Sequence, residues 1–239
     1  REKMNGFIGY QPEKIQELMQ DIANSYEKVG ETISHGWPNI PKVMQNNWKG
    51  VDEQAYEKTI ADRINTLNDK TTELVTNMIQ TIVNLANAWQ EFQNNNRIDT
   101  SVATANYDFT APAINLFDMK SVVKLNENTF AGEKLGIVTG GGALIETALT
   151  EYKTEIETGI KNIYSEYESC QAFFGNQTAS IDQFIEAVGE AIKRLNTDID
   201  DLMEYVDQHT DTGYSEADTT VSGEMGQAAT NIGSGVSNH

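Results

Sequence analysis

Trp48-Lys49-Gly50 lies between two heptad-patterned segments, and this tripeptide decides how the chain folds. Apolar residues recur at steps of three and four over 15–33 before it and over 60–92 after it, which is the spacing of a helical stripe. A helix that ends here must turn and restart antiparallel. Gly50 supplies the backbone freedom for the turn, and the Trp48 ring covers the end of the helix pair. We therefore predict an antiparallel helical hairpin over 1–97, with Pro38 and Pro41 breaking its first helix.

A second hairpin is predicted over 143–207, with Phe173-Phe174-Gly175 as its corner. A shift of 125 positions places Trp48 on Phe173 and Gly50 on Gly175, and it also superimposes the flanking heptads. This register match predicts an internal duplication. The alternative is that two unrelated heptad segments align at some register by chance.

Heptads are absent between the hairpins and after them. Residues 98–142 contain two β-branched runs, 121–125 and 135–139, on either side of a turn-like Asn126-Glu127-Asn128, so we predict an extended or β-hairpin insertion. The tail, 208–239, is rich in Gly, Ser, Thr and acids and has no Lys or Arg, which predicts disorder in isolation. The expected fold is mainly α: four long helices in two antiparallel hairpins, with a small β insertion between them.

Composition excludes several classes of function. The chain has 36 Asp and Glu against 17 Lys and Arg, and a formal net charge of −19 repels nucleic acid and anionic membranes. No apolar run reaches the length of about 18 residues that spans a bilayer. The three histidines are scattered, and the lone Cys170 lies on a heptad stripe as a small apolar residue. We therefore expect no catalytic site, metal or cofactor, and no intramolecular disulfide.

The first hairpin resembles the WXG-motif family of small helical-hairpin proteins, the substrates of type VII secretion in Gram-positive bacteria. The resemblance covers Met4 to about Asn96. It rests on the Gln11-Pro12-Glu13 helix opening, the Trp48-x-Gly50 corner and Tyr56, two turns beyond the corner. It implies a secreted or cell-surface protein. Since the N-terminus lacks the basic-then-apolar pattern of a signal peptide, export is expected without a cleaved signal.

In that family the export signal is composite: a Trp-x-Gly corner, and a Tyr-x-x-x-Asp/Glu element that follows a hairpin. Tyr214-Ser215-Glu216-Ala217-Asp218 fits the second element. The resemblance therefore implies that Trp48, Gly50, Tyr214 and Asp218 are recognised by the secretion ATPase. Trp48 and Tyr214 are expected to act in recognition rather than in folding.

The chain departs from the family pattern because members are usually single hairpins that dimerise. Two hairpins occur here, and the second carries Phe in place of Trp. The expected partners are thus another copy of the chain or a paralogous helical hairpin, unless the two hairpins pack on each other as an intramolecular pseudo-dimer. The favoured function is a non-enzymatic secreted substrate or structural partner of a type VII-like system. The alternatives are a self-assembling extracellular filament or surface subunit, and the targeting half of a secreted toxin.

Overall fold

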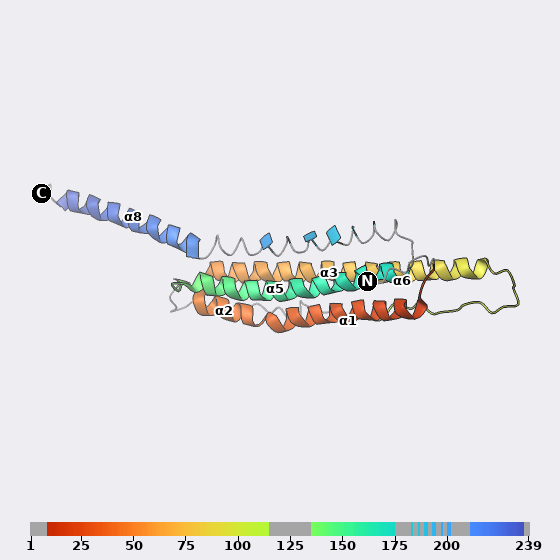
Figure 1. Ribbon diagram of the computed structural model, residues 1–239. Helices are drawn as coiled ribbons and strands as arrows, with labels where there is room; N and C mark the ends of the chain where they lie inside the picture. Colours follow the sequence, from red (N-terminus) through yellow and green to blue (C-terminus); the bar gives the residue numbers. More distant parts are fainter. Residues whose placement is uncertain are drawn as a thin grey trace.

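A computed structural model gives the fold of the chain, which is mainly helical with one small two-stranded sheet (Figure 1). This confirms the predicted fold class. The structure describes residues 9–114, 135–174 and 211–236. Between the last two ranges it also describes Gln183, Glu186, Gly189, Glu190, Lys193, Arg194, Thr197, Asp200 and Asp201.

The first helix is broken where its prolines predict. Helix α1 runs over Pro12–Gly36 and α2 over Asn39–Asn47, with Trp37 and Pro38 between them. Pro12 occupies the start of α1, where its missing N–H costs no hydrogen bond. The apolar stripe from Ile15 to Ile33 is buried along its length, so the heptad pattern is the face that packs.

Helix α3, Val51–Asn95, folds back along α1 in the antiparallel sense. Its 45 residues span about 67 Å at 1.5 Å per residue. The Tyr26 hydroxyl is 2.5 Å from Thr72 Oγ1, and the Tyr10 ring stacks on Trp89 with centroids 6.5 Å apart. Earlier residues of the first segment thus contact later residues of α3, which is the antiparallel arrangement. The two helices form the hairpin that the sequence predicts.

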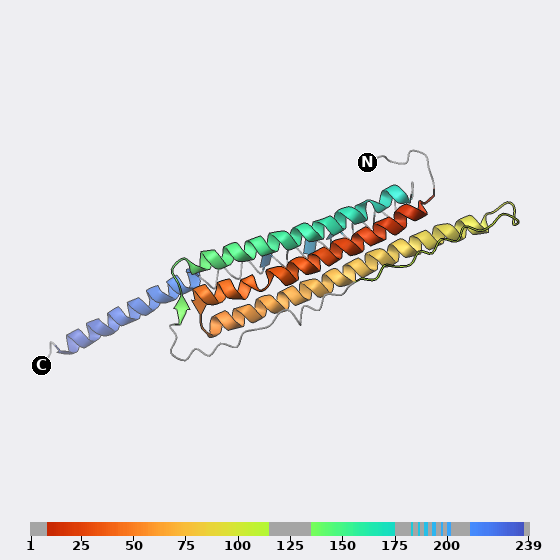
Figure 2. The same cartoon turned by 90° about the horizontal axis from the view of Figure 1, so that it is seen from below.

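Helix α5, Gly141–Glu168, packs on the other side of α1 and α2 (Figure 2). The Tyr152 hydroxyl donates to the carbonyl of Ile33 at 2.8 Å. The carbonyl of Phe173, the last residue of the short helix α6 (Cys170–Phe173), accepts from the Gln11 N–H at 3.0 Å. Helix α5 is therefore also antiparallel to α1, which makes α3 and α5 parallel to each other. Residues 96–140 join the end of α3 to the start of α5.

The α1–α5 interface is the most extensive contact between helices, and two glycines allow it. A Cβ added at Gly36 would lie 2.6 Å from the Tyr152 ring, and one at Gly159 would lie 2.6 Å from Val29 Cγ2. At both distances the Tyr152 ring or the Val29 side chain would have to shift, so the close approach of the two helices depends on glycine at these positions.

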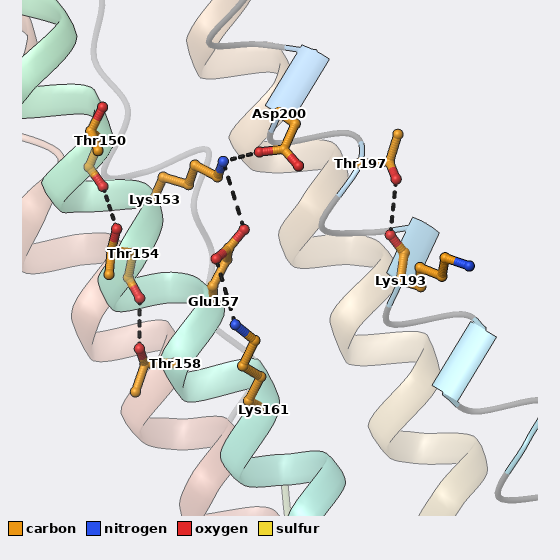
Figure 3. Close-up of polar contacts among 9 residues, drawn as sticks. All are labelled: Thr150, Lys153, Thr154, Glu157, Thr158, Lys161, Lys193, Thr197 and Asp200. Carbon is orange, nitrogen blue, oxygen red and sulfur yellow. Dashed lines mark hydrogen bonds and ion pairs between the residues drawn. The ribbon is translucent and has the colours of Figure 1, made fainter.

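The described residues between 183 and 201 are helical, and Asp200 among them contacts Lys153 of α5 (Figure 3). Lys153 contacts Asp200 and lies 3.8 Å from Glu157, and a Cβ added at Gly189 would lie 3.5 Å from the Tyr164 hydroxyl. The contacts 153 to 200 and 164 to 189 run in the antiparallel sense. The corner itself, from Gly175 onward, lies outside the described residues, and the internal duplication stays a prediction.

The small sheet is formed by β1, Trp48–Lys49, and β2, Gly136–Ile137, in antiparallel register with Trp48 opposite Ile137. The second of the two predicted β-branched runs thus contains a strand, and its partner is the Trp48 corner. The first run, 121–125, lies outside the described residues. Through this pairing, the sheet fastens the connection back to the start of the bundle.

Within the whole chain, residues 211–236 of the tail form a helix, and the disorder expected of the isolated tail stays a prediction. Helix α8 covers Asp211–Val236 and projects beyond the end of the bundle where β1 and β2 lie (Figures 1 and 2). Its composition is that of a disordered segment, but it lacks proline, and Val221, Met225 and Ile232 recur at helical spacing. A composition averaged over the whole tail does not reveal this apolar spacing.

Two side-chain amides of α3 bind the segment that leaves it. Gln90 accepts from the Tyr107 N–H at 2.7 Å and donates to the Tyr107 carbonyl at 3.2 Å. Asn94 does the same with Ala105, at 3.1 and 2.9 Å. Four residues of a helix advance about 6 Å along its axis, and two residues of an extended chain advance about 6.7 Å. Amides four residues apart on the helix are therefore spaced to bind every second residue of the extended chain. We call this arrangement the amide ladder.

We expect Asn94→Ala to release the extended segment without unfolding the bundle. Two hydrogen bonds are lost, each contributing about 0.5–1.5 kcal/mol net. Hydrogen exchange of the Ala105 and Tyr107 amides should accelerate about tenfold, while amides in α1 keep their protection. Asn87→Ala, at an exposed position of the same helix, is the matched control. Unchanged protection at Ala105 would show that the ladder does not hold the segment.

Candidate functional site

The Trp48 corner is a packed joint between three elements. The Trp48 side chain is 2% exposed, and its ring lies 5.5 Å from that of Tyr56, one of the residues of the family resemblance. The N–H of Val138 donates to the carbonyl of Asn47 at 2.7 Å, which fastens the connection beside the corner. The burial of Trp48 assigns its ring to packing. Its role in recognition stays a prediction.

Gly50 is the residue that makes the turn possible. It is buried, with φ +156° and ψ 178°, a backbone region that residues with a Cβ essentially do not occupy. The chain leaves the extended Lys49 and enters α3 within this single residue. The predicted need for glycine at the corner therefore has a direct conformational cause.

A pair of buried carboxyl groups, unexpected from the sequence, lies beside the corner in the first two turns of α3. Glu53 and Glu57 are each 1% exposed, and Gln45 of α2 donates to Glu57 Oε2 at 3.2 Å. Burial raises the pKa of Glu53 to about 7, and the charge of Glu57 and a hydrogen bond with it add to the rise. The basic residues nearest in sequence, Lys42, Lys49 and Lys58, have exposed side chains. Glu53 at the corner therefore binds and releases its proton near neutral pH.

Because the pKa of Glu53 is raised on folding from 4.5 to about 7, its contribution favours the folded state below pH 4.5 and is lost as pH rises to about 7. We expect Glu53→Gln to remove this dependence and to stabilise the protein at pH 8 by about 1–3 kcal/mol relative to the wild type, with little difference at pH 4.5. Urea titrations at both pH values measure it. Glu73→Gln, at an exposed position of α3, should shift both values equally. If the free energy of unfolding differs between wild type and Glu53→Gln by the same amount at both pH values, Glu53 ionises with its ordinary pKa.

The other predicted site residues fall into two groups. Tyr214 and Asp218 belong to α8, four residues apart along the helix, and the Asp218 side chain is exposed. Phe173 is half-buried at the end of α6, and the more deeply buried ring is Phe174, with 0% exposure. Gly175 lies outside the described residues. The equivalence of Phe173 with Trp48 stays a prediction.

Cys170 is fully buried, and desolvation raises the pKa of its thiol to about 12. Since the thiolate is the reactive form, this cysteine is inert in the folded protein. Among the described residues, no group of three His, Cys, Asp or Glu side chains is arranged to hold a metal ion. Within the same ranges, no helix has both the length and the apolar character needed to cross a membrane.

The structure brings the two arms of the predicted export signal to the same end of the molecule. Helix α8 contacts β2 and α5 close to its own start, and β2 pairs with Trp48 and Lys49. We call this end, formed by β1, β2 and the starts of α3 and α5, the corner end. No protein-family model, curated protein or solved structure matches the chain.

Proposed function

We propose that this protein is exported by a type VII-like secretion system and acts outside the cell through its surfaces, not by catalysis. The observation that carries the proposal is that β2 pairs with the Trp48-x-Gly50 corner and also contacts the helix that bears Tyr214-x-x-x-Asp218. The resemblance to the WXG-motif family attaches an export role to these two elements together. Their positions 166 residues apart in sequence do not by themselves bring them together.

The Trp48 corner and helix α8 have different roles in this proposal. Trp48 is buried, so the corner contributes a rigid joint that fixes where α8 leaves the bundle. Helix α8 offers the contact: all its described side chains, 215–227, are exposed. It also carries four acids and no base, which suits a basic groove on a secretion ATPase.

The packing of α5 on α1 supports export as one folded chain. In the family, two hairpin proteins usually cover each other in a dimer. Here α5 covers the side of α1 and α2 that α3 leaves free (Figure 2). We infer that the second half of the chain takes the place of a paralogous partner.

Secretion of full-length variants from a Gram-positive host with an active type VII system tests the proposal. We expect Tyr214→Ala and Asp218→Ala each to lower extracellular protein at least tenfold while cellular levels stay constant. Glu216→Ala removes the same charge from the same helix at a position that the motif leaves unspecified, and it should be exported normally. Equal export of all three variants, or continued export after deletion of the secretion ATPase, would refute the proposal.

A further inference from the structure

The exposed large apolar side chains of the described residues all lie toward the two ends of the elongated molecule (Figure 1). One group surrounds the end of α3, which continues past the start of α1, and consists of Phe92, Ile98, Val102 and Tyr107. We call this region, residues 90–107, the α3 tip. A second group lies at the corner end and consists of Val51, Leu135, Val138 and Leu144. Beyond it, Val221 and Met225 are exposed on α8.

Between the ends, the exposed positions of α1, α3 and α5 are polar. Side-by-side association of copies would need apolar side surfaces, whereas here the sides are polar and the ends are apolar. Single exposed apolar residues are ordinary on protein surfaces, but their confinement to both ends of a long molecule marks contact surfaces.

We propose that copies of this chain associate head to tail, the α3 tip of one copy seating on the corner end and along α8 of the next. This inference rests on the surface distribution alone and is independent of the export proposal. A single type of contact then buries the α3 tip of one copy and the α8 helix of the next. Because the two surfaces of such a contact differ, repetition gives an open filament and no closed dimer.

Contacts between like ends are less favourable. Two α8 helices side by side would bring together the exposed Glu216, Asp218 and Glu224 of each copy without a described base between them. Two α3 tips together would leave both α8 helices uncovered. A head-to-tail contact opposes fewer acids, because the tip has only Glu91 and Asp99 together with Arg97, and the corner end offers the exposed Lys49.

The surface available suits a weak but specific contact. Three helices about 10 Å across present only about 250–300 Å² at a blunt end, well below the roughly 800 Å² per partner of a stable interface. Helix α8, about 39 Å long for its 26 residues, adds about 600 Å² if half its side is covered. The overlap along α8 is therefore what brings the contact into the range of specific interfaces.

Sedimentation velocity of the purified full-length chain, from 1 to 200 µM in 0.15 M salt, tests the inference. We expect the average mass to rise with concentration without reaching a plateau. Ile98→Asp blocks the tip and Met225→Asp blocks α8; both sites are exposed, so folding should be unchanged by circular dichroism. Each should weaken association at least tenfold. Thr158→Asp, at an exposed position on the side of α5, should not.

Mixing the two blocked variants separates head-to-tail association from every other arrangement. Ile98→Asp keeps an active corner end and Met225→Asp keeps an active tip, so the mixture should form a one-to-one dimer and nothing larger. A wild type that stays monomeric at 200 µM would overturn the inference. So would a closed dimer insensitive to Met225→Asp, or a mixture that forms no dimer. Export is measured separately in cells, so the two proposals can fail independently.

Discussion

Replacing Trp48 by alanine is expected to lower the free energy of unfolding by about 3–5 kcal/mol. The ring is almost completely buried and contacts Tyr56, so its removal leaves a cavity where β1, α2 and α3 meet. At about 2–4 °C per kcal/mol for a chain of this size, the melting temperature should fall by about 6–20 °C. Thermal denaturation followed by circular dichroism measures the change. Helix content at 20 °C should stay near that of the wild type, because buried stripes of α1, α3 and α5 away from the corner still hold the helices together.

Two variants show whether the effect belongs to the corner. Trp48→Phe keeps an aromatic ring in the site, and it should recover at least half of the lost stability. Phe92→Ala removes an exposed aromatic from the α3 tip, and it should change stability by less than about 1 kcal/mol. If Trp48→Ala melts with the wild type, the ring does not hold the corner, and its role must lie in recognition.

The heptads and the prolines of this sequence predict most of the helices. They place α1, its break at Pro38, the corner, and the long α3 and α5. They do so because a buried helical face requires apolar residues at one spacing, and that spacing can be read without a structure. The choice of partner for each face is not encoded in the spacing.

That choice depends on residues that sequence patterns read differently. Gly36 and Gly159 look like weak points of their helices, yet their lack of a side chain lets α5 lie close against α1. Glu53 and Glu57 belong to the residue types that are almost never fully buried. Gln90 and Asn94 look like ordinary surface amides until an extended segment lies across them. In each case the partner is distant in sequence, and a local pattern carries no record of it.

The candidate site was predicted in part. The Trp48-x-Gly50 spacing located the corner, and Gly50 takes the conformation that only glycine allows. The sequence could not show that α8 starts beside the corner, because 166 residues and several reversals of chain direction separate Trp48 from Tyr214. Nor could it show that Trp48 is buried, since a large aromatic at a corner can cover a core or face a partner equally well.

Filling the glycine contacts between α1 and α5 is the second change with a large expected effect. Gly36→Ala and Gly159→Ala each place a methyl group 2.6 Å from atoms of Tyr152 or Val29. Overpacking of this kind costs about 1–3 kcal/mol per site, against a gain of up to about 1 kcal/mol in helix propensity. The two sites are seven or more residues apart along each helix, so their costs should add, and the double variant should lose about 1–5 kcal/mol. Urea denaturation gives the free energies.

Rescue identifies the cause of that loss. Val29→Ala removes the methyl group that Gly159→Ala would strike, so the pair should be more stable than the sum of the single variants by about 1 kcal/mol or more. Gly223→Ala in α8, with nothing within 4 Å of the new methyl group, should instead stabilise its helix by about 0.5–1 kcal/mol. If Gly159→Ala stabilises the protein as Gly223→Ala does, α1 and α5 are not in close contact, and the α5 half of the chain cannot replace a partner hairpin. A destabilised Gly159→Ala that Val29→Ala restores would tie the close approach of the two helices to this one contact.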